Sequence, residues 1–230
     1  MTHNHPSVAS LAEEVLREVV QPLPVVDIHT HINGADPSAH DISEIIFYHY
    51  IVSELTAAGV SAATMKAADT VEKKIALFLE WHGRISNTVT YWCLRRVLEQ
   101  HGIGADVKLT SEVLTSANGR VKATHGDTTW PKKALVENNR VARTALTLNI
   151  TEKFPAFDST LFFGTLRLDD VTGNVTRETL HQFAAATGKA ISSLDSFENA
   201  AHESVHAFAE GGGRAVTLGF GPEEDYGPAD

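Results

Sequence analysis

The residues best suited to chemistry are two histidines near the amino terminus, in the run Asp27-Ile28-His29-Thr30-His31. The β-branched residues that lead into this run predict a short strand over Val25–His31. Because side chains alternate between the two faces of a strand, His29 and His31 should point the same way, with Asp27 one layer deeper. Two imidazoles on one face, where a strand ends, can bind one divalent ion, for which we expect zinc. The alternative is a pair of polar residues at a strand end that hold no ligand.

A second pair, His202 and His206, is spaced four residues apart on a predicted helix and could also chelate a metal. Two solvated histidines are the better interpretation of this pair. The glycine run that follows, residues 211–213, has no phosphate-binding pattern and predicts a loop.

Four segments are predicted as strands: Val25–His31, Ala145–Ile150, Leu161–Leu166 and Ala215–Phe220. Helical periodicity is predicted over Ser10–Val20, Ile45–Ala58, Val71–His82, Thr88–His101, Lys132–Asn139, Thr176–Gly188 and Ser196–Ala209. Strands alternating with helices predict an α/β fold with a parallel sheet.

The stretch from residue 40 to about residue 130 shows no convincing strand and is predicted to be a helical insertion after the first strand. Gly59 and Gly102 are expected to end two of its helices. The polar segment Asn118–Trp130 is predicted to be an exposed loop. We therefore expect residues 1–230 to form one barrel-like domain interrupted by this insertion.

The composition excludes several classes of partner. The formal net charge is −10, and no cluster of lysine and arginine is present, which argues against binding to nucleic acid or to an anionic membrane. A single cysteine, Cys93, precludes an intrachain disulfide. The amino terminus has no secretory pattern, and no apolar run is long enough to span a membrane, so a cytoplasmic location is expected.

The pattern Asp-x-His-x-His at the end of a first strand resembles the metal motif of the amidohydrolase superfamily. The helical stretch is similar, more narrowly, to the uronate (glucuronate) isomerase family. The segments that carry this resemblance appear in the family's order and are Tyr48-His49-Tyr50, Glu54-Leu55, Ala58-Gly59-Val60, Asn87–Leu94 with Arg96, His101-Gly102-Ile103, Ala134–Thr144 and Leu166-Arg167-Leu168-Asp169. The resemblance implies a (β/α) TIM-barrel-type fold, of which this chain would be the N-terminal part.

The resemblance also implies roles for particular residues. His29 and His31 would be metal ligands. Tyr50 would contact the sugar in the active site, with His49 as a neighbouring support. Arg167 would bind the substrate carboxylate, since a guanidinium can form a bidentate pair with it. Each has a plainer alternative: Tyr50 packing on a helix face, His49 in solvent, and Arg167 as a surface charge.

The chain departs from the family pattern at three points. Leu168 stands where the family has proline, and Tyr48 stands where it has aspartate. The family's Asp-His pair near the last strand is replaced by Thr217-Leu218-Gly219-Phe220. These changes remove a carboxylate and a polar group, and they leave the identity of the substrate open.

We expect a metal-dependent aldose–ketose isomerase acting on a hexuronate such as glucuronate, or an inactive, partial relative of one. A metal-dependent hydrolase of a lactone, amide or ester is the first alternative, because a histidine pair can also activate water. A non-catalytic remnant that binds a ligand is the second. Four strands make half a barrel and leave sheet edges that proteins normally cover, so a homo-oligomer or a second chain is expected to complete the site. In that case the chain alone would be inactive as a monomer.

Overall fold

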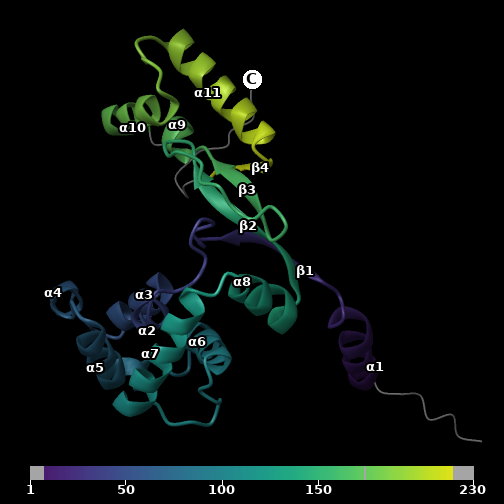
Figure 1. The fold of residues 1–230 in the computed structure, drawn as a ribbon, viewed down its shortest axis with the longest axis vertical. Helices are drawn as coiled ribbons and strands as arrows, with labels where there is room; N and C mark the ends of the chain where they lie inside the picture. Colours follow the sequence, from purple (N-terminus) through teal and green to yellow (C-terminus); the bar gives the residue numbers. More distant parts are fainter. Residues whose placement is uncertain (1–7, 174, 220–230) are drawn as a thin grey trace, which may run out of the picture. The chain divides into compact units, whose positions relative to one another are not determined.

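The computed structural model describes residues 8–173 and 175–219 (Figure 1). Its sheet has four strands in the order β1-β2-β3-β4, and every neighbouring pair is parallel. The strands are β1 (Val25–Thr30), β2 (Val141–Asn149), β3 (Phe162–Arg167) and β4 (Gly213–Thr217). This arrangement confirms the predicted α/β class and the parallel sheet.

The chain divides into two compact units. The first contains residues 1–37 and 135–230 and is called the strand unit here; the second contains residues 38–134 and is called the helical unit. The helical unit follows β1 directly in the chain, and it contains no strand among its described residues.

In the strand unit, the core forms between the sheet and the helices that follow its strands. Helix α11 (Leu194–Glu210) packs on β3 and β4, and lies beside β4 in Figure 1. Phe208 of α11 rests on Gly164 and Gly213, where the lack of side chains lets its ring approach the strands. The other helices here are α9 (Asp169–Thr172) and α10 (Arg177–Thr187). The buried residues include Leu146, Ile150, Phe162, Leu166 and Phe183.

Strand β1 forms one edge of the sheet and pairs only with β2 among the described residues. Val25, Val26 and Ile28 are exposed on it, and Ile28 retains 76% of its accessible surface. The chain reaches β1 through α1 (Val8–Val15) and a π-helical segment, Leu16–Val20. An edge with exposed apolar side chains is the kind of surface that proteins normally cover.

The helical unit has its own core. Its helices are α2 (Ile42–Ile46), α3 (His49–Ala57), α4 (Ala62–Ala67), α5 (Val71–Trp81), α6 (Val89–Gln100), α7 (Ser111–His125) and α8 (Trp130–Lys132). Five of them begin at a side-chain cap that accepts a backbone N–H hydrogen bond, from Asp41, Ser61, Thr70, Thr88 and Thr110. Completely buried residues include Ile42, Leu55, Phe78, Leu98 and Leu114.

Two predictions for this unit are wrong. The helix predicted over Ile45–Ala58 is two helices, because Tyr48 adopts an extended ψ of 143° between α2 and α3. The segment Asn118–Trp130 was predicted to be a loop, but α7 runs through its first half to His125. Burial of Leu114, Ala117 and Val121 along one face stabilises α7 despite its polar composition.

The remaining predicted elements are present with shifted ends. Gly59 and Gly102 follow α3 and α6 and have φ values of 112° and 79°, as expected for helix-terminating glycines. The predicted helix Lys132–Asn139 is the end of α8 followed by a π-helical segment, Lys133–Glu137. The last strand ends at Thr217, and Phe220 lies outside the described residues. No described helix is long and apolar enough to cross a membrane.

Candidate functional site

His29 and His31 come together at the carboxyl end of β1. Parallel pairing with β2, from Val25 opposite Val141 to Thr30 opposite Leu146, holds β1 in register. The Asp27 carboxylate accepts a hydrogen bond from the backbone N–H of His29 at 3.2 Å. The two imidazole rings then face each other edge to face, with their centroids 4.9 Å apart.

The separation of the two rings suits a shared metal ion. Their Nε2 atoms are 3.3 Å apart. Two nitrogens bound to one zinc ion at tetrahedral angles lie about 3.3–3.4 Å apart, given the usual Zn–N bond length. The pair therefore fits two adjacent positions of a tetrahedral ion with little movement. Among the described residues, no third histidine, cysteine or carboxylate forms a ligand group with them.

Arg167 lies at the carboxyl end of β3, opposite Asn149 of β2. Its Nε donates a hydrogen bond to Asp169, whose carboxylate is buried and also accepts the backbone N–H of Gly219. Burial by itself raises the pKa of the Asp169 carboxyl, but these two hydrogen bonds outweigh it and hold the pKa below its usual value. Asp169 is therefore a carboxylate that fixes the orientation of Arg167.

Arg167 lies at the same end of the sheet as the histidine pair, where the carboxyl ends of the strands meet. In a parallel sheet all carboxyl ends lie on the same side, and only β2 separates β1 from β3. Two strand spacings put the lateral separation of β1 and β3 at about 10 Å. The Arg167 side chain remains 46% exposed.

His49 and Tyr50 belong to the helical unit, where they begin α3. Both are exposed, and their rings lie 4.1 Å apart between centroids. Tyr50 and Tyr48 line an apolar cavity of about 450 Å³. Two effects raise the pKa of the Tyr48 hydroxyl: partial burial is the larger, and electrostatic repulsion from Tyr50 is the smaller. The structure thus brings Tyr50 together with His49 and Tyr48, and the predicted role of Tyr50 toward a sugar stays a prediction.

His202 and His206 lie one turn apart on α11, with ring centroids 6.1 Å apart. No described third ligand accompanies them. Glu203 directly follows His202, so residues 202–206 have the His-Glu-x-x-His spacing of zinc proteases, a pattern that the sequence interpretation missed. The Glu203 carboxylate is ion-paired with Lys189, and the interpretation of two solvated histidines stays a prediction.

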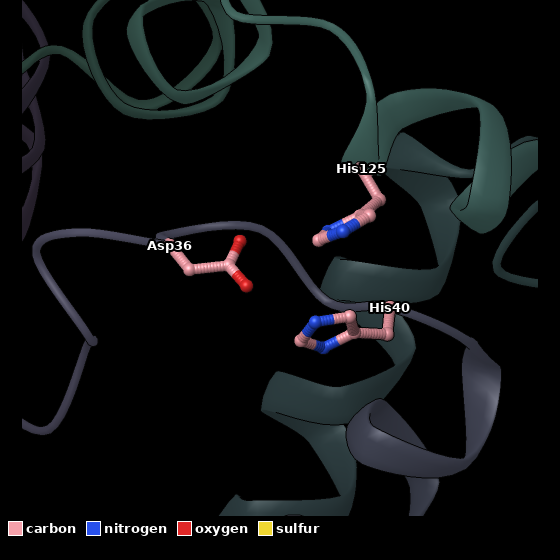
Figure 2. A group of neighbouring side chains, drawn as sticks. All are labelled: Asp36, His40 and His125. Carbon is pink, nitrogen blue, oxygen red and sulfur yellow. The ribbon is translucent and has the colours of Figure 1, made fainter.

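Another group of potential ligands was missed in the sequence. His40 and His125 lie with ring centroids 4.1 Å apart, and Figure 2 draws them with Asp36, four residues before His40. The spacing of His40 and Glu44 along the chain was a usable signal, but nothing in the sequence indicated that His125 lies beside them.

Comparison with known proteins was made by family, by sequence and by structure. No family model matches the chain. No curated protein matches it by sequence either. Two of the solved structures that are similar to it are isomerases. Glucuronate isomerase from Caulobacter crescentus aligns with a TM-score of 0.71 at 18% identity, over 94% of this chain and 49% of that one. A uronate isomerase from Bacillus halodurans aligns with a TM-score of 0.73 at 17% identity, over 96% of this chain and 54% of that one.

The chain therefore has a mixed α/β fold with a parallel sheet. More narrowly, its fold is similar to that of uronate isomerases, and the chain spans about half the length of the two solved structures. The resemblance inferred from the sequence motifs is confirmed at the level of the fold.

Proposed function

We propose that this chain carries part of the active site of a metal-assisted aldose–ketose isomerase that acts on a hexuronate such as glucuronate. The observation that carries the proposal is the pair of His29 and His31, with Nε2 atoms 3.3 Å apart, on the sheet edge that also presents Arg167. The similarity in fold to two uronate isomerases supports the same substrate class.

Arg167 is the residue proposed to bind the sugar carboxylate. Its Nε is engaged by Asp169, which leaves the two Nη atoms to face a ligand. Two parallel N–H donors match the two oxygens of a carboxylate, and this geometry selects an acid over a neutral sugar. Asp169 acts as a positioning residue, because it restricts the guanidinium to one orientation.

His29 and His31 would hold the divalent ion, which we propose to be zinc. When bound, the ion would polarise a sugar oxygen as a Lewis acid. The isomerisation itself moves a proton from C2 to C1 of the open-chain aldose and a proton from the C2 hydroxyl to the carbonyl oxygen. We propose that Tyr50, supported by His49, contacts the sugar hydroxyls.

The proposal includes the further groups that such a site needs. Two histidines supply fewer protein ligands than a catalytic zinc site normally has. We propose that a second copy of the chain, or another polypeptide, covers the exposed edge at β1 and completes the site. An exposed apolar edge strand is consistent with such a partner.

The experiment is an isomerase assay combined with a measurement of assembly. The chain is loaded with zinc and offered glucuronate, and formation of the ketose is followed by NMR, while light scattering after size exclusion gives the oligomeric state. We expect turnover only from an assembled species and none from the monomer. Hydrolysis of a hexuronic acid lactone without isomerisation would select the hydrolase instead. An active monomer would contradict the proposed completion by a partner.

A further inference from the structure

We propose that His40 and His125 form a second metal site, one that binds a divalent transition metal ion within the helical unit. His40 immediately precedes the N-terminal cap of α2, and His125 is the last residue of α7. Their ring centroids are 4.1 Å apart and the ring planes are inclined by 37° (Figure 2). The inference goes beyond the proposed isomerase and does not depend on it.

The hydrogen bonds around the two rings are those of metal-binding histidines. Nδ1 of His40 lies 3.0 Å from Oε1 of Glu44, and the backbone N–H of His40 donates to Oε2 of the same carboxylate at 2.9 Å. Nδ1 of His125 lies 3.3 Å from the carbonyl oxygen of Ser38. An acceptor at Nδ1 favours the tautomer in which Nε2 presents its lone pair for coordination. Both rings therefore have the carboxylate or carbonyl partner that usually orients a ligating histidine.

Imidazole ligands suit zinc or iron rather than calcium or magnesium. The proposal rests on His40, Glu44 and His125, which all belong to the helical unit.

The two rings would have to turn for both nitrogens to reach one ion. Nitrogen ligands of one tetrahedral zinc ion lie about 3.3–3.4 Å apart. His40 is exposed and His125 only half-buried, so rotation of their side chains can bring the nitrogens to that separation. Charge favours binding, since the Glu44 carboxylate lies next to the His40 ring.

A metal here would connect two parts of the helical unit that are far apart in the sequence. Ser38 and His125 are separated by 87 residues, and a hydrogen bond from the Ile42 N–H to the Asn118 side chain already joins the same two regions. An ion bound by both histidines would fix the start of α2 to the end of α7. Binding to the folded unit alone raises its stability.

The plainer interpretation is a pair of surface histidines, one of which forms an ion pair with Glu44. The two interpretations differ in the stoichiometry of zinc. The test uses the full-length chain with His29→Ala, which removes the first histidine pair. Zinc binding is measured by calorimetry and by elemental analysis after dialysis. In this background we expect one equivalent of zinc, and we expect adding His125→Ala or His40→Ala to weaken its binding at least tenfold.

Two further variants sharpen the test. Glu44→Gln keeps the ring's hydrogen bond but removes the charge, and should weaken zinc binding by about tenfold, as other outer-shell changes do. His181→Ala is the control, since it removes an exposed histidine on α10, and it should change nothing. Melting temperatures measured without metal show whether each variant folds. Zinc should raise the melting temperature of the His29→Ala chain, but it should not raise the melting temperature of the chain that carries both His29→Ala and His125→Ala. The proposal would be overturned if the His29→Ala chain bound zinc with the same affinity before and after addition of His125→Ala or His40→Ala. A failure of isomerase activity would leave these binding results unchanged.

Discussion

The guanidinium of Arg167 and the carboxylate of Asp169 form an ion pair at the carboxyl end of β3, and the backbone N–H of Gly219 donates to the same carboxylate. Asp169 is buried, whereas the Arg167 side chain is half exposed. This relationship restricts the orientation of a half-exposed arginine.

Replacing Arg167 by lysine should weaken hexuronate binding selectively. Lysine keeps the charge but cannot form the bidentate pair, and the loss should be about 1.5–3 kcal/mol. Calorimetric titration with glucuronate and with the matching neutral sugar measures the effect. The neutral sugar serves as the control, and an equal change for both ligands would show that Arg167 does not bind the carboxylate.

Asp169→Asn should weaken glucuronate binding without removing the binding group. The amide keeps the size of the carboxylate but loses the charge that orients Arg167, so a few-fold loss is expected, together with a decrease of about 1–3 kcal/mol in the free energy of unfolding. Asp170→Asn is the control, because Asp170 accepts a hydrogen bond from Thr151 rather than from an arginine. Equal losses in the two variants would argue against a positioning role.

His29→Ala and His31→Ala should each remove about one equivalent of zinc from the purified protein, because a single imidazole cannot hold the ion at the end of β1. Elemental analysis after identical dialysis of the wild type and variants measures this. His181→Ala, which removes an exposed histidine on α10, is the control. Unchanged zinc in the first two variants would contradict a shared site.

The part of the site that could be predicted from sequence is the part that depends on local geometry. Alternation along one strand predicted that His29 and His31 face the same way, and their Nε2 atoms are indeed adjacent. The parallel sheet followed from the alternation of strand and helix patterns. The apolar run before Arg167 predicted a strand that ends at Leu166, one residue before the observed end of β3.

The relationships that could not be predicted join residues far apart in the chain. Asp169 and Gly219 are 50 residues apart, and no local pattern indicates that this carboxylate is buried and bonded to Gly219. The same is true of His40 and His125, and of α7, where burial of Leu114 and Val121 outweighs a polar composition that resembles a loop. In each case tertiary packing decides the outcome over local preference.

Gly164→Ala should destabilise the strand unit. A Cβ at Gly164 would lie 2.7 Å from Cε2 of Phe208, which is buried against the sheet. Overpacking of this kind costs about 1–3 kcal/mol, to be measured by urea denaturation followed by circular dichroism. Adding Phe208→Leu should recover part of the loss. Gly126→Ala is the control, since a Cβ there meets no atom within 4 Å, and an equal effect of both alanines would rule out the clash.

The last prediction concerns pH and the helical unit. His101 is buried, and its Nδ1 has no hydrogen-bond partner among the described residues. Burial, and then the charge of Arg120, lower the pKa of this histidine below 6.5. The His101 side chain of the unfolded chain therefore binds a proton more readily than that of the folded chain. The free energy of unfolding is unaffected by His101 above pH 6.5, and it decreases as the pH falls from 6.5 to the pKa of His101 in the folded protein.

Replacing His101 by glutamine removes that proton-binding site and should reduce the loss of stability between pH 7.5 and pH 5.5. His82, whose pKa is also lowered by burial and then by the charge of Arg95, keeps some of the dependence. All three tryptophans, Trp81, Trp92 and Trp130, lie in the helical unit, so urea unfolding followed by tryptophan fluorescence reports on it directly. His181→Gln, an exposed change in the strand unit, should leave the pH dependence as it is. An unaltered difference in stability between the two pH values in His101→Gln would show that His101 becomes protonated equally well in the folded unit.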